Sequence, residues 1–202
     1  MSTCSTGTIT IRPATIQDSE QIRQIYNQYI TKPVTFEARI PTEEEFRQRV
    51  SGILAFYPYL VAESQGTIVG YAYAHAQAQR AAFKWNAELS IYLAPESAGH
   101  GLGKALYTAM LHLLKLQGIK TAYALITVPN KASQGLHERM GFKLEWIQPR
   151  AGFKDGSWHD VAWYLLPLAE ACEAPEDTIP ASEIDPSQFA QILADANQML
   201  KS

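Results

Sequence analysis

The chain has 202 residues, of which 47% are hydrophobic and 18% are charged, and its formal net charge at pH 7 is -3. This length suits one folded domain with an appendage, and the composition is ordinary for a globular protein. No dense run of Lys and Arg indicates nucleic-acid binding, and no apolar stretch approaches the ~20 residues of a membrane helix. We therefore expect neither a nucleic acid nor a membrane as a partner.

Hydrophobic periodicity and capping residues predict strands and helices between residues 8 and 168. Helices on either side of a mostly antiparallel sheet make this an α+β domain. Thr42 and Glu45 form a capping box for one helix, and Pro33 ends the helix before it. In chain order we expect a strand at 8–12, a helix from 15, a helix from 42, a hairpin of strands at 59–63 and 67–75, a strand at 88–93, a helix ending near 116, a strand at 120–128, a short helix at 130–140, and strands at 142–149 and 158–166.

The chain after this domain, residues 169–202, has a different composition. It holds seven acidic residues against the single base Lys201, whereas residues 1–168 carry a small excess of bases. Its first part, 169–186, is rich in Pro, Glu, Asp and Ala and predicts a solvated linker. An apolar stripe over 186–200 predicts an amphipathic helix, docked on its own domain in preference to a partner.

The two ends of the chain favour a cytoplasmic protein. Residues 1–10 lack the charged start and apolar core of a secretion signal. The two cysteines, Cys4 and Cys172, flank the expected domain. Two free thiols in a reducing compartment are the favoured interpretation, and a disulfide between them is the alternative.

A glycine-rich turn between the strand at 88–93 and the next helix is the most informative motif. Gly99, Gly101 and Gly103 would let the main chain approach phosphates closely, and the free N–H groups of the helix start attract an anion. The chain has no Gly-x-x-x-x-Gly-Lys-Ser/Thr phosphate loop. A Rossmann site would need a third glycine near Ala105 and an acidic residue within 117–130, and both are missing.

The segment Ala98-Gly99-His100-Gly101-Leu102-Gly103 resembles motif A of the Gcn5-related N-acetyltransferase (GNAT) superfamily, Gln/Arg-x-x-Gly-x-Gly/Ala. That motif binds the pyrophosphate of acetyl-CoA. Ala98 stands where the motif has Gln or Arg, which removes a side chain but keeps the main-chain donors. The resemblance implies a GNAT fold, extended here by a C-terminal helix, and acetyl-CoA as the acetyl donor.

Further segments resemble the phosphinothricin and methionine sulfoximine N-acetyltransferases within this superfamily. The resemblance implies transfer of acetyl to the amine of a small amino-acid-like acceptor, without a metal, by a homodimer. Acetylation of protein or peptide amines, or a non-catalytic acyl-CoA binding module, are the alternatives. The matching segments are Thr35-Phe36-Glu37 and residues 57–63, 70–74, 128–133, 136–142 and 152–161.

The chemistry needs a base for the acceptor ammonium and an acid for the leaving thiol. The resemblance implies that Glu88 is the base; an ion-paired strand carboxylate is the alternative. His137 stands where many GNAT enzymes have the tyrosine that protonates the leaving thiolate, and histidine donates protons near neutral pH. Tyr107 is a second candidate acid. Packing roles are the alternative for both residues.

The resemblance also implies a set of cofactor-binding residues. Basic and aromatic residues together suggest an acceptor set, although a surface or core role is the alternative for each of them taken alone. Asn130 could equally be only a helix cap. The main-chain N–H groups over 90–93 are expected to hydrogen-bond the thioester oxygen. The cofactor set comprises Ile91, Tyr92, Leu93, Ala98, Gly99, His100, Gly101, Leu102, Gly103, Lys104, Asn130 and Ser133. The acceptor set comprises Phe36, Glu37, Arg80, Phe83, Lys84, Trp85 and Lys154, whose basic groups would pair with an acidic substrate.

Overall fold

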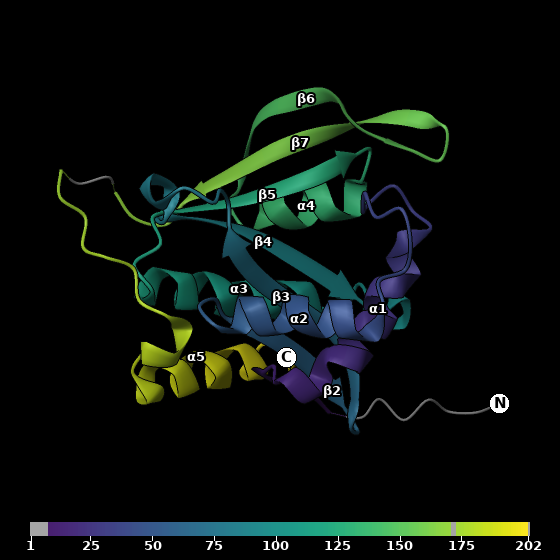
Figure 1. Cartoon of the computed structure of the whole chain (residues 1–202). Helices are drawn as coiled ribbons and strands as arrows, with labels where there is room; N and C mark the ends of the chain where they lie inside the picture. Colours follow the sequence, from purple (N-terminus) through teal and green to yellow (C-terminus); the bar gives the residue numbers. More distant parts are fainter. Residues whose placement is uncertain (1–7, 171–172, 202) are drawn as a thin grey trace.

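The structure, a computed structural model, describes residues 8–170 and 173–201. A seven-stranded sheet forms its centre, in the order β1-β2-β3-β4-β5-β7-β6 (Figure 1). All neighbouring strands are antiparallel except β4 and β5, which run parallel. The predicted α+β class is confirmed. The strands are β1 (Ile9–Pro13), β2 (Tyr59–Ser64), β3 (Thr67–Ala76), β4 (Asn86–Leu93), β5 (Thr121–Val128), β6 (Lys143–Lys154) and β7 (Ser157–Pro167).

Helices cover both faces of the sheet. The predicted capping box starts α2: the amide of Thr42 donates to Glu45 Oε2 at 2.8 Å, and the amide of Glu45 donates to Thr42 Oγ1 at 3.2 Å. Short 3-10 turns, η2 (Ala81–Phe83) and η3 (Pro95–Ser97), lie before and after β4. The α-helices of the described residues are α1 (Ser19–Ile30), α2 (Glu43–Leu54), α3 (Leu102–Leu116), α4 (Lys131–Arg139) and α5 (Pro186–Gln198).

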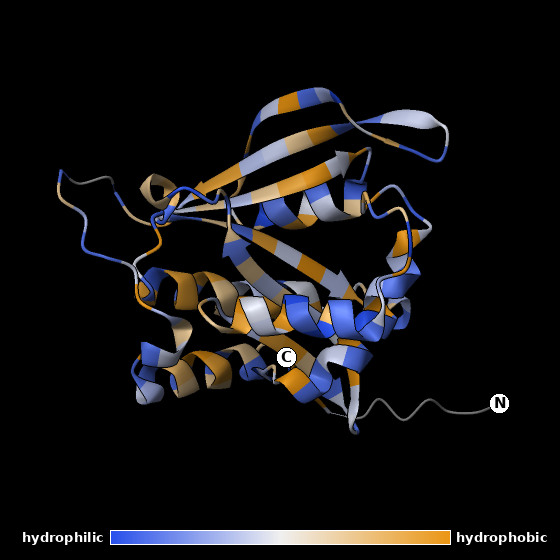
Figure 2. Ribbon diagram, viewed as in Figure 1, coloured by the Kyte–Doolittle hydropathy of each residue, from blue (hydrophilic) through white to orange (hydrophobic). Residues whose placement is uncertain are grey.

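The alternation of side chains along the central strands builds two hydrophobic cores. One set, including Tyr59, Val61 and Tyr71, packs under α1 and α2. The intervening residues face α3, whose whole predicted stripe is buried, from Leu102 to Leu113. In Figure 2, α3 is accordingly hydrophobic along most of its length, whereas α2 alternates between blue and orange. The sheet therefore offers two chemically different faces on the same strands.

Strands β6 and β7 are longer than the sequence predicts. The sequence analysis ends the first at Pro149, whereas β6 runs to Lys154. In the structure the pairing is irregular between Gln148 and Gly152, with Arg150 at a φ of 50°, and the strand continues. Asp155 and Gly156, with φ of 50° and 78°, then form the tight turn of a hairpin. This Asp-Gly pair is a hairpin signal that the sequence analysis left unused.

The C-terminal segment is not a solvated linker over its whole length. The side-chain amide of Gln117 donates to the carbonyls of Phe56 and Ile179, and Ile184 is buried in the core around α3. This part of the interpretation was wrong because the apolar residues between the prolines find partners on the domain. Beyond it, α5 packs beside α3 and β1, and it lies below α3 in Figure 1.

Two expectations concern residues at the limits of what the structure describes. Cys4 and Cys172 lie outside the described residues, so the state of their thiols stays a prediction. Within residues 8–170 and 173–201, the helices are all too short or too polar to cross a membrane.

Candidate active site

Strand β4 pairs differently with its two neighbours. It is antiparallel to β3 along its length, from Ala87 to Leu93. It pairs with β5 only over Asn86 to Glu88, after which the two strands diverge. The main-chain edge of residues 89–93 that faces β5 is therefore open at the divergence.

A cavity of about 580 Å³, here the splay cavity, fills this divergence. It is bounded by β4, β5, the glycine turn, the N-terminal part of α3 and one side of α4. Thr127, Leu136 and Arg139 also line it, and the sequence analysis did not single them out. Of the predicted cofactor-binding residues, those that line it are Ile91, Tyr92, Leu93, Ala98, Gly99, Gly101, Gly103, Lys104, Asn130 and Ser133.

The glycine turn leaves the start of α3 open to an anion. Gly101 is the N-cap with a φ of 79°, so no side chain caps the helix. The first N–H groups of a helix lack intrahelical acceptors. Gly103 has a different reason to be glycine, because a Cβ there would lie 3.3 Å from Leu136 Cδ2. The turn can therefore bind a diphosphate through its main-chain N–H groups, without the Gln or Arg side chain that motif A has at the position of Ala98.

Three predicted cofactor residues take more specific places. Leu102 is buried in the core, so only its main chain is available to a ligand. The side chain of His100 is exposed. Asn130 caps α4, since its Oδ1 accepts from the amide of Ser133 at 3.2 Å. The helix-cap alternative for Asn130 therefore describes its contact in the structure, although the residue also lines the splay cavity.

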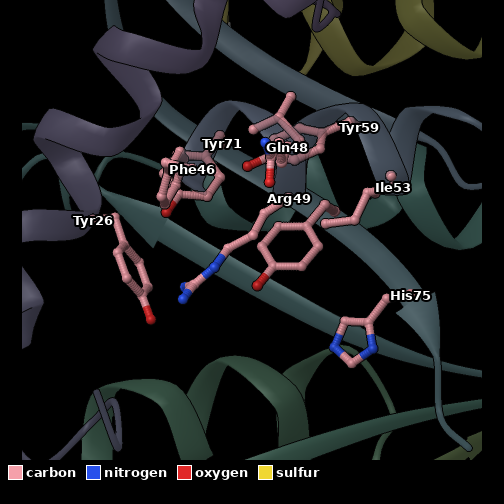
Figure 3. A pocket seen from close by; sticks show the side chains of 11 residues that line it. Tyr26, Phe46, Gln48, Arg49, Ile53, Tyr59, Tyr71 and His75 are labelled. Carbon is pink, nitrogen blue, oxygen red and sulfur yellow. The ribbon is translucent and has the colours of Figure 1, made fainter. Parts of the chain in front are cut away.

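A second cavity, here the aromatic cavity, lies on the opposite face of the sheet, under α1 and α2. Its volume is about 320 Å³. Figure 3 shows Arg49 extending from α2 into the space between Tyr26 and His75. The other aromatic residues that line the aromatic cavity are Phe46, Tyr59, Tyr71 and Tyr73.

Glu88 projects beside this aromatic cavity. In the β3–β4 ladder Tyr73 is opposite Ser90, and His75 is opposite Glu88. Glu88 Oε1 is 3.8 Å from His75 Nε2, and the Glu88 side chain is 20% exposed. Burial raises the pKa of Glu88 above its ordinary value, and the charge of a protonated His75 opposes that rise. A carboxyl group with a pKa moved toward neutrality suits a general base.

Tyr107 and His137 form a buried pair that also lines the splay cavity. Tyr107 Oη is 3.0 Å from His137 Nε2, and His137 Nδ1 is 2.8 Å from the carbonyl oxygen of Ser133. Burial lowers the pKa of His137 and raises that of Tyr107, so both are neutral. Because a carbonyl only accepts, the His137 Nδ1–H donates to it, and Nε2 accepts from the tyrosine hydroxyl. A neutral His137 therefore has no proton on Nε2, and the proton nearest the cavity belongs to Tyr107.

Among the predicted acceptor residues, Glu37 lies beside the aromatic cavity. It forms an ion pair with Arg49, and its Oε1 accepts from Tyr26 Oη at 3.3 Å. Phe36 instead packs over Gly152 of the β6–β7 hairpin. Arg80 and Phe83 are exposed in the loop before β4.

The structure uses the other three predicted acceptor residues for internal contacts. Lys154 Nζ donates to the carbonyls of Ile30, Lys32 and Thr35 at 2.5, 2.9 and 2.7 Å, and so fastens the segment after α1. Lys84 forms an ion pair with Asp177, and Trp85 Nε1 donates to the carbonyl of Glu176 at 2.9 Å.

The sequence analysis missed Arg49, Tyr73 and His75. A usable signal existed for the last two, because alternation along β3 places them on the face of Glu88 once the hairpin register is known.

Comparison with known proteins agrees with this geometry. A family model described as an acetyltransferase (GNAT) domain matches residues 11–163. A phosphinothricin N-acetyltransferase of Streptomyces viridochromogenes is 37% identical, over 87% of this chain and 96% of its own. An L-methionine sulfoximine/L-methionine sulfone acetyltransferase of Pseudomonas aeruginosa is 32% identical, over 82% of this chain and 98% of its own.

Solved structures show a similar fold. The chain is similar to a GNAT superfamily phosphinothricin acetyltransferase of Sinorhizobium meliloti in complex with AcCoA. The TM-score is 0.80 at 36% identity, and the match covers 85% of this chain and 95% of that one. The family model ends at residue 163, so α5 and the segment before it lie outside the match.

Proposed function

Because the chain belongs to the GNAT acetyltransferase family, we propose that it acetylates the amine of a small amino-acid-like acceptor of the phosphinothricin or methionine sulfoximine type. The chain is an acetyl-CoA-dependent N-acetyltransferase, as its family and its named relatives indicate. The observation that carries the acceptor class is the aromatic cavity, which combines the guanidinium of Arg49 with aromatic walls beside Glu88.

The splay cavity supports the donor side of this proposal. The free N–H groups at the start of α3 would hold the diphosphate of acetyl-CoA, and the open edge of residues 90–93 would hydrogen-bond its pantetheine arm and thioester oxygen. When bound, acetyl-CoA supplies an activated acetyl group on sulfur. The fixed main-chain donors need no side chain to polarise that group.

The aromatic cavity supports the acceptor side. Arg49 Nη1 contacts Glu37, and the guanidinium has further N–H groups for the carboxylate or phosphinate of an acceptor. A cavity of about 320 Å³ has the size of sites for small molecules. This size favours a free amino acid analogue over the amine of a folded protein. Phenol and phenyl walls would enclose the acceptor side chain.

The proposed proton transfers follow from the two titratable sites. Glu88 removes a proton from the acceptor ammonium, directly or through a water, so that the amine can attack the thioester. Tyr107 turns its O–H from His137 Nε2 to the departing thiolate and protonates it, and the second proton that the acceptor nitrogen loses restores the phenol, which again donates to His137. His137 is then a positioning residue for Tyr107.

The test is thiol release, followed with a thiol reagent at saturating acetyl-CoA. The acceptors are phosphinothricin, methionine sulfoximine, the common amino acids and a panel of peptides. We expect release with the amino acid analogues, and a fall in kcat of about 10²-fold or more in Glu88→Gln with acetyl-CoA binding retained in calorimetry. Preference for peptides would overturn the acceptor class. Absence of turnover with every amine, together with normal acetyl-CoA binding, would favour the non-catalytic module.

We also propose that the enzyme is a homodimer formed through the β6–β7 hairpin. The strand β6 is an edge strand, and the hairpin extends away from the domain at the top of Figure 1. Exposed apolar side chains on edge strands favour association. Sedimentation should give twice the chain mass, and Trp146→Glu should give the monomer; a monomeric wild type would refute the proposal. The exposed apolar side chains there are Leu144, Trp146, Ile147, Phe153 and Trp158.

A further inference from the structure

We propose that His75 receives the proton that Glu88 takes from the acceptor and passes it to solvent. The inference rests on the proposed role of Glu88 as the base. His75 comes from β3, faces Glu88 across the ladder and lines the aromatic cavity.

The stoichiometry of the reaction requires such a path. An acceptor ammonium has three N–H bonds, and the secondary amide product has one. As the C–N bond forms and the C–S bond breaks, one of the two lost protons ends on the sulfur of coenzyme A. The other must leave the protein in every turnover. It leaves from Glu88, whose side chain is only 20% exposed.

The ring of His75 is placed to take this proton. Its Nδ1 is 3.0 Å from the carbonyl oxygen of Ala76, so Nδ1 carries the hydrogen in the neutral ring. The lone pair is then on Nε2, the atom 3.8 Å from Glu88 Oε1. The proton passes from the Glu88 carboxyl to Nε2 directly or through one water, which leaves a carboxylate beside an imidazolium. The His75 side chain is 36% exposed, so the imidazolium can return the proton to solvent.

Other titratable groups around Glu88 are unsuited to this task. Tyr73 on β3, Tyr92 on β4 and Tyr107 on α3 are close enough to feel its charge. Burial raises the pKa of each phenol, so each stays protonated and cannot accept. Arg49 of α2, on the same face, is a permanent cation. Of these side chains, His75 combines a ring nitrogen that faces Glu88 with access to solvent.

The experiment compares His75→Ala and His75→Gln with the wild type at low buffer concentration. The matched control is His112→Gln, an exposed histidine on the outer side of α3. We expect kcat to fall about 10-fold in both His75 variants, less than the roughly 10²-fold or more that a direct general base contributes, because water can still carry the proton away slowly. Added imidazole should restore most of kcat in His75→Ala, while the wild type and His112→Gln should not respond. Thermal unfolding checks that both variants are folded.

The pH profile of kcat/KM gives a second measurement that a packing role would not change. Glu88 must be ionised to act, so activity rises with pH through its pKa. In the wild type a protonated His75 lowers that pKa. In His75→Gln the rise should therefore occur at higher pH than in the wild type.

Two results would overturn the inference about His75. One is a folded His75→Ala enzyme with unchanged kcat at low buffer. The other is a His75→Ala enzyme with a lowered kcat that added imidazole does not restore, together with an unchanged pH profile in His75→Gln. Glu88→Gln is measured in parallel. If it retains full activity, the base assignment fails and the inference falls with it; if it is inactive, only the role of His75 is under test.

Discussion

The side chain of Asn197 allows a quantitative test of how the C-terminal extension is attached. It lies on α5 and binds the free edge of β1 as a neighbouring strand would. The amide of Ile11 donates to Asn197 Oδ1 at 2.6 Å, and Asn197 Nδ2 donates to the Ile11 carbonyl at 3.0 Å. Ile11 is buried in the core. We predict that Asn197→Ala destabilises the protein, since it removes both partners of a main-chain pair that stays shielded from water.

The expected loss follows from these contacts. Two intramolecular hydrogen bonds are worth about 1 kcal/mol each, and a buried group left unpaired adds about 1 to 2 kcal/mol. The free energy of unfolding should therefore fall by about 3 to 4 kcal/mol. With a urea m-value near the upper end of the usual range, about 3 kcal/mol per M, the midpoint should fall by about 1 M.

The assay is equilibrium urea unfolding followed by tryptophan fluorescence. The matched control is Gln198→Ala, the next residue of α5, whose side chain is exposed. Its free energy of unfolding should change by no more than about 0.5 kcal/mol, as is typical of surface substitutions. If Asn197→Ala shifts the midpoint no more than this control does, the two hydrogen bonds between Asn197 and Ile11 do not contribute to stability, and the prediction is refuted.

Two further predictions concern the site. Arg49→Ala should raise the KM of the acceptor by about 10- to 100-fold with a smaller change in kcat, because the charge-assisted bonds are lost, and Arg49→Lys should recover only part of it. An equal KM for the acceptor in the wild type, Arg49→Ala and Arg49→Lys would show that another residue binds the acidic group of the acceptor. The second prediction concerns the pH dependence of stability. Burial lowers the pKa of His137 below 6.5. At pH values below 6.5 the unfolded chain therefore binds more protons than the folded chain. Stability should then decline below about pH 6.5, and His137→Phe should decline less in urea melts at pH 7.0 and 5.5; parallel declines would contradict this assignment.

The elements predicted best from sequence are those governed by local interactions. The capping box at Thr42 and Glu45, the stripe of α3 and the glycine turn each involve residues within a few positions of one another. The family resemblance and the donor, acetyl-CoA, were likewise readable from short motifs and are confirmed. The divergence of β4 from β5 was not readable, because it depends on how two strands separated by α3 pair in space.

The acceptor residues were predicted less well for a physical reason. A lysine ammonium binds a substrate carboxylate and a main-chain carbonyl by the same donation, so the sequence cannot separate the two uses. In the structure Lys154 binds three carbonyls of its own chain, and Lys84 binds Asp177. The sequence analysis assigned no role to Arg49. Only the packing of α2 over the sheet brings it to the aromatic cavity.

The central strand explains how one short segment serves three purposes at once. Along β4, Glu88 lies opposite His75, which lines the aromatic cavity, and the alternate side chain of Leu89 belongs to the core under α3. The main-chain edge beyond Glu88 faces the splay cavity, since β5 no longer pairs with it. In the proposed mechanism, the carboxylate of Glu88 and the main-chain donors of residues 90–93 therefore act on one reacting centre from two directions. Substitutions along β4 should then have separable effects: Glu88 variants should lower kcat, whereas variants of the buried Ala87 and Leu89 should lower the free energy of unfolding.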